Sequence, residues 1–228
     1  IIYPYDNEKA VVERVMEKGN TKNEILEAAL NLFSTQGYEA TSILQIAEAV
    51  GIRKASLYSH FTSKQEILDV LVRDGLKQYA DNSIFARADW DDPEFTKDKH
   101  DLTPEKAVSM VLGQVRYILH DPRISKSRKM LTIEQFRNPT LSALQTKQNY
   151  TDVMRYFTRL MKFLIREGKL TPCDPEIMAA QFCLPVSVWI NLCDREPERA
   201  DEIEALIERH IRQFFEMYGA ERQEGTKL

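Results

Sequence analysis

The 228-residue chain is poor in the residues that end strands and form tight turns. It contains only eight glycines and nine prolines, too few for the many turns of an all-β fold. It also lacks any run of about 18 consecutive apolar residues, the length that would predict a membrane-spanning helix. We therefore expect an all-α protein with no membrane partner.

Cysteine and histidine are also scarce. The three cysteines form no Cys-x-x-Cys pair and leave one unpaired in any disulfide scheme, which favours buried thiols in a reducing compartment. The four histidines occur in no Glu-x-x-His or His-Glu-x-x-His motif, so a metal-dependent helical-bundle enzyme is disfavoured. The first 15 residues show no basic region followed by an apolar block. We expect a cytoplasmic protein that is not an enzyme and uses no cofactor or metal.

Positive charge is in short supply as well, because 35 acidic residues outnumber 31 lysines and arginines and give a formal net charge of -4. The exception is the stretch GIRKASLYSHFTSKQEIL, residues 51–68, which carries Arg53, Lys54, His60 and Lys64 and has no acid before its last three residues. Duplex DNA carries one negative charge per roughly 1.7 Å of its axis, so an acidic protein that binds it must gather cations on the docking face. This stretch predicts that face.

Helix signals surround the basic stretch. The capping box TKNE, residues 21–24, predicts the start of one helix. A second helix begins near Thr41 or Ser42 and ends at Gly51, where a sharp reversal can use positive φ without penalty. A third covers residues 54–61 after a turn of about three residues. Two short helices joined in this way predict a helix-turn-helix, whose second helix lies in the major groove of DNA.

The placement of polar side chains agrees with DNA binding. Arg53 and Lys54 stand at the start of the second helix of the motif, the end that approaches base edges, and Tyr58 follows one turn later. Ser42, in the first turn of the supporting helix, can hold a phosphate together with helix-terminal N–H groups. Lys64 stands near the amino end of the next helix and is expected to contact a phosphate. The simpler interpretation of each is a solvated surface residue.

The sequence from Gly37 to Leu68 resembles the DNA-binding signature of the TetR family of bacterial transcriptional regulators. It has the Gly-aromatic turn, Thr-Ser-Ile, Ile-Ala, Gly-Ile, Leu-Tyr-x-His-Phe and Ser-Lys-x-x-Ile-Leu. The resemblance is strong over about residues 21–71, and beyond residue 80 it extends only to the layout of helices. Arg53 is a departure, since it stands where the family often has a capping serine.

The resemblance implies a three-helix DNA-binding domain followed by a larger helical domain for effector binding and dimerisation. His60 is expected to contact the DNA backbone or to have a structural role. We divide the chain into an N-terminal extension at 1–20, longer than is usual in the family, a helix-turn-helix domain at 21–66 and a helical domain at 67–228. The candidate DNA-binding residues are Thr41, Ser42, Arg53, Lys54, Ala55, Ser56, Tyr58, His60 and Lys64.

Residues 81–103 lack helical periodicity and are acidic, so we expect a connector there. Beyond it, several helix starts are marked by a capping residue directly before a proline. The expected helices lie near residues 104–120, 123–136, 139–167, 175–193 and 200–218.

Large apolar side chains recur on these helices. Methionine and aromatic residues adapt to varied apolar ligands, so together they could line a pocket, although plain core is the simpler interpretation of each one. Glu134 would add a polar anchor. The candidate ligand-binding residues are Met110, Tyr117, Met130, Glu134, Phe136, Tyr150, Met154, Phe157 and Trp189.

The last two helices carry more apolar width than one neighbouring helix would cover, which predicts a homodimer through them. We expect a homodimeric repressor that a small apolar or amphipathic effector releases from palindromic double-stranded operator DNA. A regulator without an effector, or an activator of the same fold, is the alternative.

Overall fold

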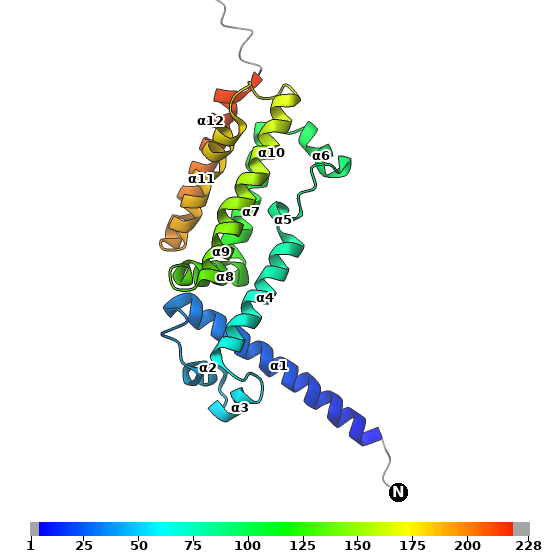
Figure 1. The fold of residues 1–228 in the computed structure, drawn as a ribbon, viewed down its shortest axis with the longest axis vertical. Coiled ribbons are helices and arrows are strands. Elements are labelled where there is room, and N and C mark those ends of the chain that lie inside the picture. The colour runs from blue at the N-terminus through cyan, green and yellow to red at the C-terminus, as the bar shows by residue number, and fades with distance from the viewer. Residues whose placement is uncertain (1–4, 221–228) are drawn as a thin grey trace, which may run out of the picture. The chain divides into compact units, whose positions relative to one another are not determined.

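The computed structural model describes the backbone of residues 5–220 and the side chains of residues 20–220. The chain forms two compact units. Unit 1 takes in the described residues up to Tyr79 together with Lys126–Asn138, and unit 2 takes in Ala80–Ser125 and the described residues from Pro139 onward. Across residues 5–220 the regular structure is helical, without a β-strand, as predicted (Figure 1).

The compact units do not follow the order of the sequence, and the domain boundary at residue 66 stays a prediction. Helix α4 (Lys64–Asn82) begins in unit 1 and buries Ile67 and Leu68 there. The segment Lys126–Asn138, much later in the sequence, also belongs to unit 1. Burial of these apolar side chains, and not the helix start, therefore sets the extent of the unit.

Unit 1 begins with a helix that is longer than its capping signals predicted. Helix α1 (Tyr5–Gln36) runs through the TKNE box at residues 21–24 without a break, so the prediction of a helix start there was wrong. The preceding residues are mostly good helix formers, and Gly19 costs a helix interior only about 1 kcal/mol. The predicted end was correct, since Gly37 follows α1 with a φ of 85°.

The other helices of unit 1 are short and share one core. They are α2 (Ile43–Val50), α3 (Lys54–Tyr58), the first part of α4 and most of α8 (Pro122–Glu134). Fully burying one large apolar side chain stabilises a fold by roughly 1.5–3 kcal/mol, so this core holds the short helices in place. The apolar residues of unit 1 that are at most 1% exposed are Ile25, Ala29, Leu30, Phe33, Ile46, Ala47, Leu57, Phe61 and Ile67.

Unit 2 is a bundle in which α7, α10, α11 and α12 lie alongside one another around a second apolar core (Figure 1). The predicted helix over residues 139–167 is a continuous run with a π-helical turn, Lys147–Thr151, in its middle. The helices are α5 (Ile84–Arg87), α6 (Pro93–His100), α7 (Pro104–His120), α9 (Pro139–Thr146), α10 (Asp152–Arg166), α11 (Pro175–Cys193) and α12 (Ala200–Tyr218).

The cap-proline signals gave correct helix starts. The Thr103 hydroxyl accepts the Lys106 N–H at 3.3 Å, and Asp174 accepts the Glu176 N–H at 2.9 Å. Thr103 thus pairs one of the N–H groups that a helix start leaves free, and Asp174, which also accepts the Ile177 N–H at 3.3 Å, pairs two.

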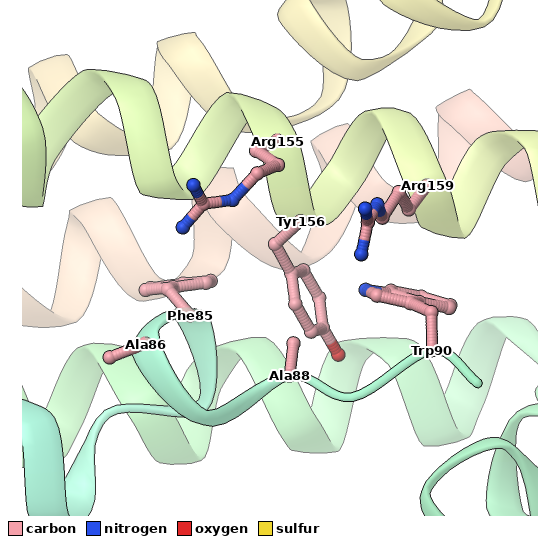
Figure 2. A pocket seen from close by; sticks show the side chains of 7 residues that line it. All are labelled: Phe85, Ala86, Ala88, Trp90, Arg155, Tyr156 and Arg159. Carbon is pink, nitrogen blue, oxygen red and sulfur yellow. The ribbon is translucent and has the colours of Figure 1, made fainter. Parts of the chain in front are cut away.

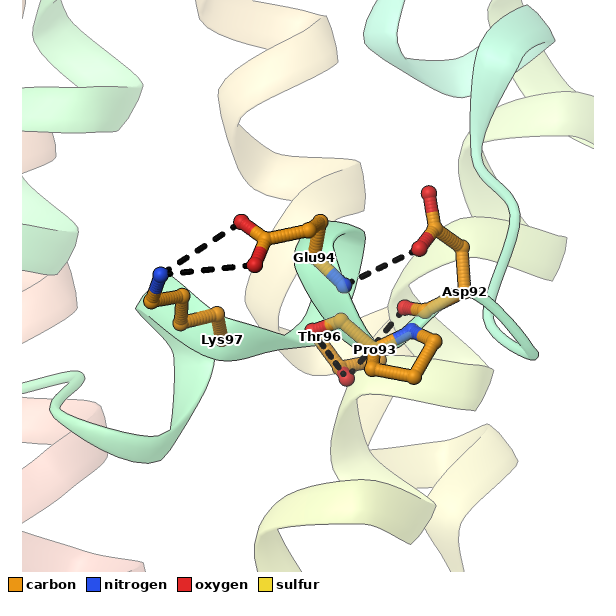
Figure 3. A network of polar contacts seen from close by, with 5 residues as sticks. All are labelled: Asp92, Pro93, Glu94, Thr96 and Lys97. Carbon is orange, nitrogen blue, oxygen red and sulfur yellow. Dashed lines mark hydrogen bonds and ion pairs between the residues drawn. The ribbon is translucent and has the colours of Figure 1, made fainter.

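Residues 81–103 are not the irregular connector that we expected, because they contain α5 and α6. Helix α6 begins after Asp92, whose carboxylate accepts the Glu94 N–H at 3.0 Å, and an exposed ion pair joins Glu94 to Lys97 (Figure 3). Asp92–Pro93 is the same cap-proline signal that marks α7 and α11. Helices of eight residues or fewer are too short to show clear apolar periodicity, so periodicity alone does not reveal α5 and α6 in the sequence.

Helix α11 is the one helix among the described residues that is long and apolar enough to cross a membrane. That is weak evidence for a membrane span, because core helices of globular proteins have the same composition. Met178, Phe182 and Cys183 of α11 are buried in the core of unit 2.

Candidate nucleic-acid interface

The turn between α2 and α3 is fixed by caps at both ends of α2. The Ser42 hydroxyl accepts the Gln45 N–H at 3.2 Å, and the Gln45 side chain accepts the Ser42 N–H at 2.8 Å. At the other end Gly51 has a φ of 77°, and the Ile52 N–H donates to the Ala47 carbonyl at 2.9 Å. A residue with a side chain is strained at that φ, so glycine is required for the reversal that leads into α3.

Helix α3 is anchored by its apolar face and presents its polar face to solvent. Leu57 is buried, and so is Phe61, just beyond the helix. Arg53 is the N-cap residue and makes no side-chain capping bond. This agrees with the expectation from the sequence, where an arginine stands in place of the usual capping serine. Both Arg53 and Lys54 are exposed, and no described side chain pairs with either. Their charges are therefore available to an anionic partner.

The rest of the exposed face has the composition of a groove-binding surface. Ala55 and Ser56 are exposed and short, which lets the helix backbone approach a partner closely, and Tyr58 is 46% exposed. His60 is half-buried at the edge of this face. Arg53 and the predicted residues of α3 are thus exposed on one short segment, and residues 51–65 contain no acid.

Lys64 does not extend freely from this surface. Its ammonium donates to the carbonyls of Tyr38 and Thr41 at 2.7 and 2.8 Å, and it lies 4.1 Å from the centre of the Tyr38 ring. These contacts hold the α1–α2 turn against the start of α4. The predicted phosphate contact of Lys64 stays a prediction, and the structure adds a structural role for it.

Thr41 also has partners within the protein. It is 1% exposed, its hydroxyl donates to the Gly37 carbonyl at 2.8 Å, and it accepts a bond from Gln36. Ser42, next to it, is exposed at the start of α2. Of this pair, Ser42 is the one that presents a helix N-terminus to an anion.

Glu134 is a contact of the α1–α2 turn that sequence reasoning missed. It is 3% exposed, and its carboxylate accepts the Tyr38 N–H at 2.8 Å. A Cβ on Gly37 would lie 3.0 Å from the same oxygen. Burial and then the nearby carboxylates of Glu39, Asp69 and Glu134 raise the pKa of Tyr38. No local pattern links these residues, because 96 positions separate Glu134 from Tyr38.

The nine candidate ligand-binding residues are divided between the two units. Met130, Glu134 and Phe136 belong to unit 1, where Met130 is buried and Phe136 is 90% exposed. The other six belong to unit 2. Of these, Met154 is buried, Phe157 and Trp189 are half-buried, and Met110, Tyr117 and Tyr150 are exposed. A shared binding role for the nine stays a prediction. Nor do the described residues hold a group of three or more His, Cys, Asp or Glu side chains that could bind a metal ion.

Sequence comparison identifies two matching families. Residues 25–71 match the family described as bacterial regulatory proteins, tetR family. Residues 106–220, half of the chain, match the C-terminal domain of AefR-like transcriptional repressors.

A curated relative is IcaR of Staphylococcus aureus, the negative transcriptional regulator of the biofilm operon icaADBC. It is 46% identical over 52 residues, which are 23% of this chain and 28% of IcaR. The match therefore spans less than a third of that relative's length.

Several solved structures have a similar fold over most of this chain. SmeT of Stenotrophomonas maltophilia, in complex with triclosan, has a TM-score of 0.59 at 17% identity, covering 92% of this chain and 95% of SmeT. A transcriptional regulator from Saccharomonospora viridis, in complex with choline, has a TM-score of 0.57 at 18% identity, covering 88% and 98%. At these identities the likeness shows the fold alone.

Proposed function

Because the chain belongs to the TetR family of bacterial transcriptional regulators, we propose that it is a homodimeric repressor released from a palindromic operator by a small molecule. It acts in the cytoplasm, where its DNA is. Regulation by DNA binding, not catalysis, is the activity of this family.

The exposed pair Arg53 and Lys54 at the amino end of α3 is the observation that supports operator binding most directly. In a helix-turn-helix the amino end of the second helix enters the major groove, where arginine and lysine donate to guanine O6 and N7. A two-fold symmetric protein places two such helices on two half-sites about one helical turn apart, which is why the operator is expected to be a palindrome.

We assign the dimer to α11 and α12, but not to all of their large apolar residues. Ile207 and Phe214 of α12 are buried within a single chain, so they do not need a partner to cover them. Ile177, Val188 and Met217 are 56–63% exposed on the same two helices. These side chains supply the uncovered apolar surface that a second copy would bury.

Two helices connect the proposed effector domain with the DNA-binding unit. The chain passes from unit 1 to unit 2 within α4 and back within α8. A ligand that favours one arrangement of the unit 2 helices would act through these two continuous helices on the helix-turn-helix. The neighbours with triclosan and choline support the choice of a small-molecule effector.

DNA selection from a random pool tests the operator proposal. The selected sequences should form an inverted repeat, and the full chain should bind that duplex far more tightly than a scrambled one at the same salt concentration. An asymmetric consensus, or equal affinity for both duplexes, would contradict it.

Sedimentation tests the dimer. The protein should sediment as a dimer at micromolar concentration, and Val188→Glu should yield monomers because a charge would be buried in the interface. Tyr150→Glu places the same charge at an exposed aromatic position outside α11 and α12 and should leave the dimer intact. A monomeric parent protein would refute the proposal.

A further inference from the structure

Unit 2 contains a cavity of about 260 Å³ beside one face of α10 (Figure 2). Its walls are the rings of Phe85 of α5, Trp90 of the following turn and Tyr156 of α10. Ligand sites typically measure about 300–1,000 Å³. This cavity lies just below that range, so it has room for a molecule of one or two rings.

The aromatic walls support one another. The Tyr156 ring centre lies 5.4 Å from those of both Phe85 and Trp90, and Trp90 lies 5.4 Å from Phe95 of α6. The Phe85–Tyr156 and Trp90–Phe95 pairs are edge-to-face, which is favourable because the positive edge of one ring meets the negative face of the next, and the Trp90–Tyr156 pair is tilted. Tyr156 is buried, and burial raises its pKa to about 12, so its hydroxyl is neutral. The walls thus offer preformed, uncharged surface to a flat apolar body.

The remaining polar groups that border the cavity are donors. Arg155 and Arg159 are four residues apart on α10, so both guanidinium groups lie on the cavity side (Figure 2). Arg155 also pairs with the buried Asp152 at 2.6 Å, whereas Arg159 has no ion pair or hydrogen bond to a described residue.

The indole N–H of Trp90 is buried and has no acceptor among the described residues. Figure 2 shows this nitrogen next to the Arg159 guanidinium. Two donors cannot satisfy each other, and a buried N–H without an acceptor costs free energy. This end of the cavity therefore lacks an acceptor.

No carboxylate lines the cavity to supply that acceptor. Asp89, Asp91 and Asp92 flank Trp90 in the sequence, but none of them lines the cavity. Asp89 accepts the Asp91 N–H at 3.1 Å, and Asp92 accepts the Glu94 N–H at 3.0 Å. The charge at the cavity is therefore positive. A cationic ligand would be repelled there, and an anion would pair with the donors.

We propose that this cavity binds a small aromatic carboxylate. Its ring lies against Phe85 and Tyr156, and its carboxylate accepts hydrogen bonds from the Arg159 guanidinium and the Trp90 indole. This names the chemical class of the effector, and it rests on the proposed function only for the step from ligand binding to DNA release.

Calorimetry on the DNA-free full chain tests the binding step. The probes are benzoate, 2-naphthoate and indole-3-acetate, and the matched controls are 2-naphthalenemethanol and 2-naphthylmethylammonium. At least one carboxylate should bind with a Kd below about 1 mM, roughly tenfold or more tighter than the neutral and cationic analogues, because hydrogen bonds to a charged group are the strongest available.

Variants assign the binding to the cavity. Arg159→Met should weaken the carboxylate about tenfold or more, and Trp90→Phe, which keeps a ring but removes the N–H, should weaken it several-fold. Arg209→Met removes an exposed arginine of α12 that does not line the cavity, and it should leave the Kd unchanged. If Arg159→Met does not fold, Arg159→Lys replaces it and should bind more weakly than the parent, because it loses the planar fork.

Three results would overturn the inference: no carboxylate binds, the ammonium analogue binds as tightly, or folded Arg159 variants bind like the parent. DNA release is measured separately, by fluorescence anisotropy on the selected duplex. Carboxylate binding without release would uphold the anion site and contradict the effector proposal. Release of the duplex by other compounds, with no carboxylate bound, would uphold regulation by a small molecule and contradict the anion site.

Discussion

Replacing Lys64 separates a structural role from a DNA contact. Its ammonium donates to two backbone carbonyls of the α1–α2 turn, those of Tyr38 and Thr41, and lies over the Tyr38 ring. Hydrogen bonds to a charged group contribute about 1.5–3 kcal/mol each, and an exposed cation–π contact about 0.5–1 kcal/mol. The contributions share one group and are not additive, so Lys64→Ala should lower the free energy of unfolding by about 2–4 kcal/mol.

The expected DNA phenotype follows from that role. Each phosphate contact contributes about -0.9 to the slope of log K against log salt concentration. If Lys64 serves the turn, the folded Lys64→Ala protein should keep the salt slope of the parent and bind operator and scrambled duplexes less tightly only as its stability falls. Urea denaturation gives the stability, and titration of both duplexes at several salt concentrations gives the slope.

Lys54→Ala is the matched control. Lys54 is exposed and has no partner among the described residues, so its loss should change stability by no more than about 0.5 kcal/mol. If Lys54 touches a base edge, its loss should cost operator binding about 1–3 kcal/mol per half-site and affect scrambled DNA less. The structural role of Lys64 is refuted if Lys64→Ala matches the parent in stability while its salt slope falls by about 0.9 per subunit.

Three further outcomes are expected. Gly37→Ala should lower stability in urea by about 1–3 kcal/mol, because Gly37 has a φ of 85° and the new Cβ would lie 3.0 Å from Glu134; a loss below about 0.5 kcal/mol would contradict this. Hydrogen bonds from Thr62 hold the pKa of Glu66 below its usual value. That contribution is present at neutral pH and is lost as pH falls through the lowered pKa, so Glu66→Gln should lose less Tm than the parent on acidification; equal losses would count against it. Burial raises the pKa of the Cys183 thiol to about 12, so Cys183 should resist alkylation at about pH 8 while the exposed Cys173 is labelled, as mass spectrometry would show; equal labelling in the folded protein would disprove it.

The helix ends and the DNA-binding motif could be predicted because their signals are local. Gly51 ends α2 where a left-handed residue is needed, and Thr103 and Asp174 cap α7 and α11 through N–H groups two or three residues away. The basic residues at the start of α3 likewise needed only helical geometry to be placed on one face. The TKNE box at residues 21–24 predicted a helix start that the structure does not have, because a capping sequence competes with propagation of the helix from upstream, and propagation is favoured there.

Only the tertiary structure decided which side chains of the DNA-binding motif are free to contact DNA and where unit 2 has a cavity for a ligand. Lys64 looked free in the sequence, yet packing placed two carbonyls of the α1–α2 turn within its reach, and Glu134 was brought to the same turn from 96 residues away. Arg159 and Trp90 border one cavity because α10 packs beside the segment at α5. The sequence around either residue does not predict this contact. Capping and periodicity act within one or two helical turns, whereas the partner of a buried or half-buried polar group is set by how distant helices pack.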